Sequence, residues 1–421
     1  MIKRDLYAKL KEHLSQKEMS VIVGPRQAGK TTLMEQLRAE IKTTGARTAF
    51  FNVDVEADRT VMASQERLLQ AIRASIGREH GYVFLDEIQR KENAGLFLKG
   101  LYDQHLPYKF IVSGSGSIEL KAKVHESLAG RKQTFELSTC SFLEFAQYRT
   151  AYAYGERISE FLAADRVRAD TLLEEYVSRG GYPRAVVAER LDEQRAIMAE
   201  IVRAYMERDI TVLLGVTKDE AFGSLVRLLA REVGQVVNMS ALAQTIGIAP
   251  RTAQQYLHYI EQTFIARRVP PFFRNARKEI RKSPVYYFCD LGMRSHAADA
   301  YGLPTIGQGN GFAFENFVHR VLDEQAERAY ARLYFWRTKD GAEVDFVLAR
   351  GDVLVPVEVK DSVLRSATVG RSLRSFIAQY HPPRSYLIHR GEPMEARVDD
   401  TVVSFMPWHT LVCTPVLDAQ Q

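Results

Sequence analysis

The chain has 421 residues, of which 46% are hydrophobic, a fraction that is ordinary for a soluble globular protein. This length predicts two to four domains at roughly 100–200 residues each. The 57 Lys and Arg residues exceed the 52 Asp and Glu residues, and the net charge of +5 permits an acidic partner without requiring one.

The cysteines and the apolar runs exclude several classes of protein. Cys140, Cys289 and Cys413 form no CxxC pair, so neither a zinc ribbon nor a disulfide framework is expected. No run of 18 apolar residues occurs, and the charged segment Met1–Leu6 lacks the apolar stretch of a signal peptide. We therefore expect a cytoplasmic protein without a membrane partner.

Helical and strand-like patterns alternate over the first 112 residues. Apolar residues recur every fourth position from Ile2 to Leu14 and predict an amphipathic helix. Nearly all-apolar strands that alternate with helices are typical of a parallel sheet covered on both faces. The predicted strands are 20–23, 47–53, 81–85 and 109–112, and the predicted helices are 33–41, 68–76 and 95–104.

A glycine-rich loop joins the first strand to the following helix and matches GxxxxGK[ST]. In this context the loop predicts backbone N–H groups that cradle phosphate at a helix N-terminus. We expect Lys30 to contact the β- and γ-phosphates of ATP and Thr31 to bind the Mg²⁺ that accompanies it. The predicted ATP-binding residues of the loop are Gly24, Pro25, Arg26, Gln27, Ala28, Gly29, Lys30, Thr31 and Thr32.

Polar residues follow two later strands of the predicted sheet. Asp86 and Glu87 come directly after an apolar strand, at the carboxyl end where parallel sheets bind ligands. Asp86 is predicted to hold Mg²⁺ and Glu87 to activate the attacking water. Ser113 follows the next strand and is predicted to sense the γ-phosphate, with an ordinary turn as the alternative.

Arg131 is predicted to act in catalysis on a neighbouring subunit. An arginine supplied in trans stabilises the charge of the transition state for phosphoryl transfer. A surface ion pair is the alternative for this residue.

Five segments in this order resemble one large family of bacterial and archaeal proteins: GPRQAGKTTL, FLDEIQ, SGSGSIEL, LAGRKQTFELSTCSFLEF and GGYP. The family consists of AAA+-type P-loop ATPases with a C-terminal domain of unknown function. The resemblance covers nearly the whole chain. It implies the nucleotide-site roles given above and a C-terminal domain related to the PD-(D/E)xK nuclease fold.

The segment Asn238–Leu257 has the pattern of a helix-turn-helix. Ser240 is expected to cap the first helix, Gly247 to end it, and Pro250 to lie in the first turn of the second. A basic stretch follows and suits contact with DNA phosphates by a wing. The predicted DNA contacts are Arg251, Arg267, Arg268, Arg274, Arg277, Lys278, Arg281 and Lys282. Packing within an oligomer is the alternative use of this module.

Acidic residues and a lysine are predicted to gather on neighbouring strands near the C-terminus. Alternation along a strand places Glu358 and Lys360 on one face, and Asp345 lies on the adjacent strand. With Glu315 from a preceding helix, these carboxylates are candidate metal ligands for phosphodiester cleavage. Glu343-Val344-Asp345 departs from the usual Pro-Asp pair, so an inactive structural remnant is the alternative. Trp336 and Arg337 are predicted either to clamp nucleic acid or simply to pack.

The predicted fold class is α/β, with four parts. These are an AAA+-type P-loop core over 1–150, a helical segment over 151–215, a winged helix-turn-helix over 216–300 and a restriction-endonuclease-like domain over 301–421. One hypothesis is an oligomeric, ring-shaped ATPase, of which a hexamer is one form, that processes DNA. The other is a regulatory ATPase whose C-terminal parts bind proteins.

Overall fold

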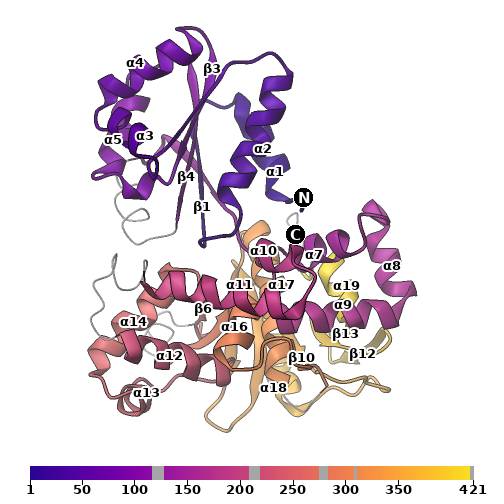
Figure 1. The fold of residues 1–421 in the computed structure, drawn as a ribbon. Helices are drawn as coiled ribbons and strands as arrows, with labels where there is room; N and C mark the ends of the chain where they lie inside the picture. Colours follow the sequence, from indigo (N-terminus) through magenta and orange to yellow (C-terminus); the bar gives the residue numbers. More distant parts are fainter. Residues whose placement is uncertain (116–127, 208–218, 275–282, 308–310, 418–421) are drawn as a thin grey trace.

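The computed structural model of the chain describes residues 1–115, 128–207, 219–274, 283–307 and 311–417, which form two bodies (Figure 1). An N-terminal α/β body contains the elements up to β5, and the remaining elements form a larger body beneath it. None of the helices in these ranges combines the length and apolar character needed to cross a membrane.

A parallel five-stranded sheet forms the centre of the N-terminal body, in the order β2-β3-β4-β1-β5. Its strands are β1 (Met19–Gly24), β2 (Thr48–Asn52), β3 (Gly81–Asp86), β4 (Tyr108–Ser115) and β5 (Lys132–Glu136). The four predicted strands and the parallel arrangement are confirmed. The edge strand β5 was not predicted, because its half-exposed sequence lacks the apolar run of a buried strand.

Helices cover both faces of this sheet. One face packs α1 (Leu6–Glu12) and α2 (Lys30–Thr43) against Ile22, Phe84 and Ile111. The other face carries α4 (Gln65–Ile76) and α5 (Ala94–Tyr102), which pack around Val21, Val83 and Val112. The described part of this body also contains three short elements: η1 (His13–Ser15), α3 (Glu56–Val61) and η2 (Ile88–Arg90).

A helical region begins the larger body. It contains α7 (Phe142–Arg149), η3 (Gly155–Arg157), α8 (Ile158–Ala164), α9 (Arg166–Arg179), α10 (Pro183–Val187) and α11 (Leu191–Ala204). Ser141 and Glu144 form a reciprocal capping box that starts α7. Phe142 contacts Tyr176 and Trp408 through edge-to-face ring pairs, so α7 packs with the larger body although it precedes residue 150.

Three helices and a two-stranded antiparallel sheet follow. They are α12 (Asp219–Arg231), α13 (Met239–Thr245), α14 (Pro250–Gln262), β6 (Ala266–Val269) and β7 (Val285–Phe288). Gly247 has the left-handed φ of 71° expected after a helix, and Pro250 starts α14. The prediction for Ser240 was wrong: Asn238 caps α13 and accepts hydrogen bonds from the Ser240 and Ala241 amides. Helix α16 (Leu291–Ala297) ends this region.

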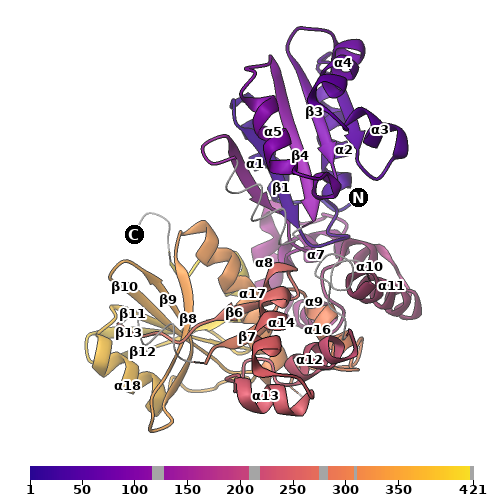
Figure 2. The same cartoon turned by 90° about the vertical axis from the view of Figure 1, so that its left-hand side faces the viewer.

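A six-stranded mixed sheet closes the chain, in the order β12-β13-β11-β10-β9-β8. Its elements are α17 (Gly311–Arg328), β8 (Arg332–Arg337), β9 (Glu343–Arg350), β10 (Val353–Val359), α18 (Arg371–Tyr380), β11 (Arg384–His389), β12 (Met394–Val398), β13 (Thr401–Pro407) and α19 (Trp408–Cys413). Helices α17 and α18 pack on opposite faces of this sheet (Figure 2). This part of the chain begins with α17 and continues with three antiparallel strands, β8, β9 and β10. Helix α18 then leads to β11, which is parallel to β10.

Candidate nucleotide site and its neighbours

The strand order of the N-terminal sheet brings its polar residues to one edge. Because β4 lies between β1 and β3, the loop after β1, Ser113 on β4 and Asp86 on β3 are neighbours at the carboxyl ends of the strands. Ligands bind at this edge in parallel α/β sheets.

Two glycines give the loop its shape. Gly29 has a φ of 95° immediately before α2, a conformation that favours glycine. Gly24 has a φ of 157°, and a Cβ there would lie 2.0 Å from the carbonyl oxygen of Leu137. No other residue fits at Gly24 without displacing the segment that follows β5.

Lys30 is buried at the start of α2, and its ammonium bonds to carbonyl oxygens of the loop. The distances from Nζ are 3.1 Å to Gly24 O and 2.8 Å to Pro25 O. A phosphate oxygen in the loop would form a stronger, charge-assisted bond with this ammonium. The loop therefore fits the triphosphate of a nucleotide, as the sequence predicts.

Three side chains converge on the Asp86 carboxylate. The Thr31 hydroxyl donates to Oδ2 over 2.8 Å, the Ser113 hydroxyl donates to Oδ1, and the Asn52 amide lies 3.4 Å from Oδ2. Asp86 is fully buried. The structure thus brings together Thr31, Asp86 and Ser113, and the hydroxyl and carboxylate oxygens are ligands that Mg²⁺ prefers.

Glu87 projects from a strained backbone next to this group. Its φ of 56° places a non-glycine residue in the left-handed region, which is uncommon outside sites with a special geometry. Its amide donates to Asp86 Oδ1 over 3.1 Å, and the Gln89 side chain donates to its carboxylate over 2.5 Å. The Gln89 contact therefore holds the Glu87 carboxylate, while the backbone of the same residue is bonded to Asp86.

An arginine near the N-terminus joins the loop to the larger body. The Arg4 guanidinium donates to Ala28 O over 2.8 Å and to Ser138 O over 2.6 Å, and it pairs with Glu144 at 2.9 Å. Arg4 was not predicted as a site residue, because nothing local in the sequence distinguishes it from other arginines.

A cavity of about 900 Å³ opens beside the loop, between the N-terminus, α2 and helices α10 and α11. Its volume lies within the range of small-molecule sites. Gly29, Thr32 and Leu33 line one side, and Pro183 and Arg184 line the other. The Arg184 guanidinium donates to the Gln27 side chain over 2.9 Å and pairs with Glu200. Arg184 directly follows the GGYP segment, one of the five segments that carry the family resemblance, so the sequence pointed to this position.

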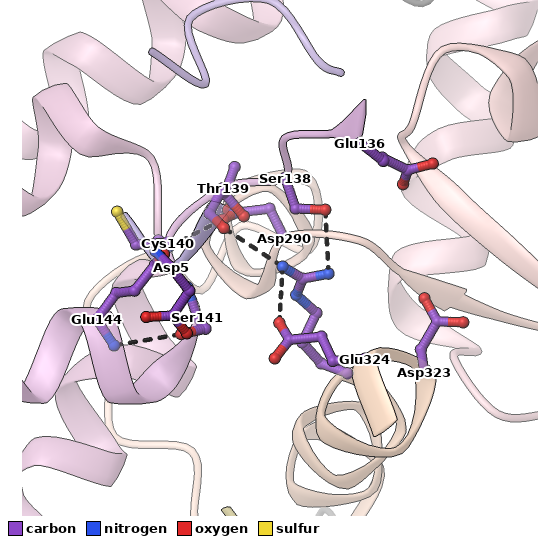
Figure 3. Close-up of polar contacts among 12 residues, drawn as sticks. Asp5, Glu136, Ser138, Thr139, Cys140, Ser141, Glu144, Asp290, Asp323 and Glu324 are labelled. Atoms are coloured by element: carbon purple, nitrogen blue, oxygen red, sulfur yellow. Dashed lines mark hydrogen bonds and ion pairs between the residues drawn. The ribbon is translucent and has the colours of Figure 1, made fainter. Parts of the chain in front are cut away.

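The segment after β5 connects the loop to the C-terminal sheet. Leu137 N donates to Val23 O at the end of β1, and the Arg320 guanidinium of α17 donates to Thr139 O over 3.3 Å. Arg320 also pairs with Glu324 at 3.1 Å, and Figure 3 shows Ser138, Thr139 and Glu324 around this contact. Residues 137–141 are therefore held by both bodies.

Arg131 lies at the edge of the sheet opposite to the loop. Its carbonyl oxygen accepts from Met19 N, at the amino end of β1, whereas the loop follows the carboxyl end. Its guanidinium pairs with Asp103 at 2.7 Å. Arg131 therefore cannot serve the loop of its own chain, and a role in trans stays a prediction.

The predicted DNA contacts have different surroundings. Arg251 and Arg268 are exposed, and Arg274 lies over the ring of Tyr380 at 5.4 Å. Arg267 instead faces inward, where its guanidinium pairs with Glu136 and lies 3.6 Å from Asp323. The remaining four, Arg277, Lys278, Arg281 and Lys282, lie outside the described residues.

The C-terminal acidic residues adjoin one another, and Lys360 beside them is exposed. Glu358 pairs with Lys360 at 2.7 Å, and Asp345 accepts from the amide of Val359 over 2.7 Å. The Tyr287 hydroxyl of β7 donates to Glu315 over 2.5 Å. Burial raises the pKa of Glu315 to about 8, with the Asp345 charge as a further cause.

The described residues contain no group of three His, Cys, Asp or Glu side chains arranged to hold a metal ion. The metal site at Glu315, Asp345 and Glu358 stays a prediction. Trp336 is buried against Phe376 and Tyr380, which matches the packing alternative for that residue.

Family models match three consecutive parts of the chain. Residues 16–146 match a model described as an AAA domain. Residues 170–302 and 310–411 match models described as domains of unknown function, DUF8612 and DUF4143. The N-terminal body, with its parallel sheet and glycine loop, is thus similar to an AAA domain.

Relatives align along most of the chain. An uncharacterized protein of Mycobacterium tuberculosis is 26% identical over 419 residues, covering 99% of this chain and 86% of the relative. An uncharacterized protein of Haemophilus influenzae is 23% identical over 351 residues, covering 81% and 82%. Among solved structures, the Aeropyrum pernix ORC1 protein in complex with DNA is 13% identical and covers 70% of this chain and 91% of its own, with a TM-score of 0.32. That score is too low to support an argument.

Proposed function

We propose that this protein is a Mg²⁺-dependent ATPase of the AAA+ type. The observation that carries the proposal is the convergence of Thr31, Ser113 and Asp86 beside the glycine loop and Lys30. Bound Mg²⁺ would neutralise charge on the phosphate oxygens, and Thr31 and Asp86 would hold it. Lys30 binds the phosphates, and Glu87 orients the attacking water and takes its proton.

The cavity beside the loop is suited to the nucleoside part of ATP. It begins at Gly29 and Thr32, where the triphosphate would end, and apolar side chains such as Ile2 and Val187 line it. Arg184 contacts the loop from α10 across this cavity. Nucleotide binding would therefore strengthen the contact between the two bodies.

Hydrolysis in this proposal takes place between subunits of a homo-oligomeric ring. The position of Arg131, at the edge of the sheet remote from its own loop, supports a role on the neighbouring subunit. The transition state for phosphoryl transfer carries charge that such an arginine stabilises.

DNA is the proposed partner to which hydrolysis is coupled. The succession of α12, α13, α14 and the β6–β7 pair supports a winged-helix module. Arg251 on α14 and Arg268 on β6 present exposed cations that suit phosphate contact. The strand and helix order of the C-terminal sheet supports a nuclease-like domain that engages the same DNA.

The test is ATP hydrolysis by the full chain with single-stranded, duplex and branched DNA over a salt series. We expect turnover that rises with DNA and loses this stimulation as salt increases. Lys30→Ala is the control for contaminating ATPase. Turnover that ignores every DNA would overturn the coupling to DNA, and absence of turnover would overturn the ATPase itself.

A regulatory ATPase that binds proteins is the second candidate, favoured by the contacts that the C-terminal acidic residues already make within the chain. Lys360 is paired with Glu358, and Tyr287 from β7 contacts Glu315. An inactive nuclease-like domain would have such an arrangement. Metal-dependent cleavage of DNA that disappears in Asp345→Ala, with ATPase activity retained, would contradict this candidate.

A further inference from the structure

A second cavity, of about 360 Å³, lies where β6, α17 and β8 meet. Three arginines and one aspartate line it: Arg267 and Arg268 from β6, Asp323 from α17, and Arg332 from β8. The segment after β6 runs beside β8, because Phe272 N donates to Phe335 O and Phe335 N donates to Pro270 O. The cavity is therefore built by two predicted domains together.

The arginines of this cavity divide into one that is neutralised and two that face solvent. Arg267 is held between the carboxylates of Glu136 and Asp323. Arg268 and Arg332 are exposed, and neither forms an ion pair with a described residue. Arg267 thus compensates one of these two negative charges, and the two exposed arginines at the rim of the cavity outnumber the one that is left.

A buried imidazole supplies a second, independent sign of a ligand. His319 lines the cavity with 2% of its surface exposed, and neither ring nitrogen has a hydrogen-bond partner among the described residues. A buried polar group without a partner costs about 1–3 kcal/mol. The ring stacks on Tyr287 with centroids 4.4 Å apart, so its orientation is fixed. Burial lowers its pKa to about 4, so the neutral ring has one N–H to donate at neutral pH.

We propose that this cavity binds a backbone phosphate of single-stranded nucleic acid, with Arg268 and Arg332 as the cations and His319 as a neutral donor. The inference rests on the proposed partnership with DNA. It adds that the bound DNA is single-stranded and names the residues that bind it. An anion with oxygen acceptors on every side satisfies both arginines and the imidazole together.

An exposed aromatic ring favours a nucleic acid over a small phosphate. Tyr330 lies two residues before Arg332 and is 92% exposed. Its φ of 53° places it in a left-handed turn between α17 and β8. Single-strand binding sites combine cations that follow the backbone with aromatic rings on which bases stack. In duplex DNA the bases are stacked inside the helix, so none is available to stack on this ring.

The experiment measures fluorescence anisotropy of a labelled DNA strand of about 20 nucleotides over a salt series, with the full chain. The variants are Arg268→Ala with Arg332→Ala, Tyr330→Ala, and Arg397→Ala as the matched control. Arg397 is an exposed arginine on β12, at the opposite edge of the same sheet. All four side chains are exposed, so these substitutions preserve the core.

The double arginine variant should lower the salt dependence of log K by about 0.7, because both arginines bind the same phosphate and one single-strand phosphate contact contributes about 0.7. Tyr330→Ala should weaken binding about fivefold or more with an unchanged slope, since stacking on an aromatic ring is worth about 1–3 kcal/mol per base. Arg397→Ala should match the wild type.

Three other results would overturn the inference. If the wild type binds DNA and the double variant has the same salt dependence of log K, this cavity is not the phosphate site. The proposed partnership with DNA would be unaffected by that result. An equal loss on a duplex of the same length removes the preference for a single strand. If the wild type itself binds neither DNA, the proposed partnership fails, and the cavity fails with it.

Discussion

The Thr31 hydroxyl donates a 2.8 Å hydrogen bond to the Asp86 carboxylate, although 55 residues separate the two in the chain. The contact exists because β4 separates β1 from β3 by one strand, so a helix that starts after β1 reaches the end of β3. Two oxygen ligands suited to Mg²⁺ are therefore in place before a nucleotide binds, and binding requires little reorganisation.

Replacement of Lys30 by alanine should strongly weaken ATP binding. The buried ammonium lies within the loop and bonds to two of its carbonyls, and hydrogen bonds to charged groups are worth about 1.5–3 kcal/mol each. We expect a loss of affinity of at least tenfold in calorimetric titration with ATP. Lys42→Ala, at the exposed end of the same helix, should bind ATP normally. Normal turnover by Lys30→Ala would contradict the assignment of the site.

Glu87→Gln should separate ATP binding from hydrolysis. The amide keeps the size of the side chain and its contact with Gln89 but accepts no proton. Loss of a positioned general base lowers the rate by about 10²–10⁴-fold. We expect single-turnover hydrolysis to slow by this factor, with ATP retained and a more stable oligomer in size-exclusion chromatography. Glu92→Gln, on the exposed surface nearby, is the control. Full turnover in Glu87→Gln would remove the catalytic role.

The parts of this site that depend on local order could be predicted from the sequence. The loop, Asp86 and Ser113 each follow an apolar strand, and the parallel sheet places the ends of such strands together. Arg4 was not predictable, because its partners Glu144 and Ser138 lie 140 and 134 residues away. Arg267 shows the reverse error: a basic stretch suggested an exposed cation, and tertiary contacts with Glu136 and Asp323 neutralise it.

Arg131→Ala should lower hydrolysis without weakening ATP binding. Its carbonyl contact with Met19 places it away from its own loop, so any catalytic effect requires a second subunit. We expect an equimolar mixture with Lys30→Ala to recover part of the activity, because each variant supplies what the other lacks. The measurement is steady-state ATPase activity of the mixture against each variant alone.

Asp103→Asn, which breaks the ion pair but keeps Arg131, should remain active. Absence of recovery in the mixture would count against a role in trans.

Arg184→Ala should weaken ATP binding more than it slows hydrolysis. Arg184 lines the cavity beside the loop and contacts Gln27, but it lies on α10, away from Glu87. Loss of a binding contact raises KM and leaves kcat nearly unchanged. We expect a rise in KM for ATP of about fivefold, corresponding to about 1 kcal/mol. Arg166→Ala, which removes an exposed ion pair with Glu392, should leave both constants unchanged. A fall in kcat alone would place Arg184 at the reacting phosphate instead.

His319 should make the protein less stable in acid. Burial lowers its pKa from 6.5 to about 4, so between these values the unfolded chain binds more protons than the folded chain. Stability therefore falls as the pH falls from about 6.5 towards 4, by roughly 2 kcal/mol at about pH 5 for this one group. His409 shifts in the same direction, also through burial, so the variant should remove only part of the loss.

The test is the free energy of unfolding of His319→Gln against the wild type at about pH 7.5 and about pH 5. The variant should lose less stability than the wild type between the two, whatever its stability at the higher pH, because glutamine does not titrate. His258→Gln, at an exposed position on α14, should lose as much as the wild type. An equal acid loss in His319→Gln would mean that this imidazole already has a partner or is accessible to water. In that case it would not be the donor proposed for the phosphate cavity.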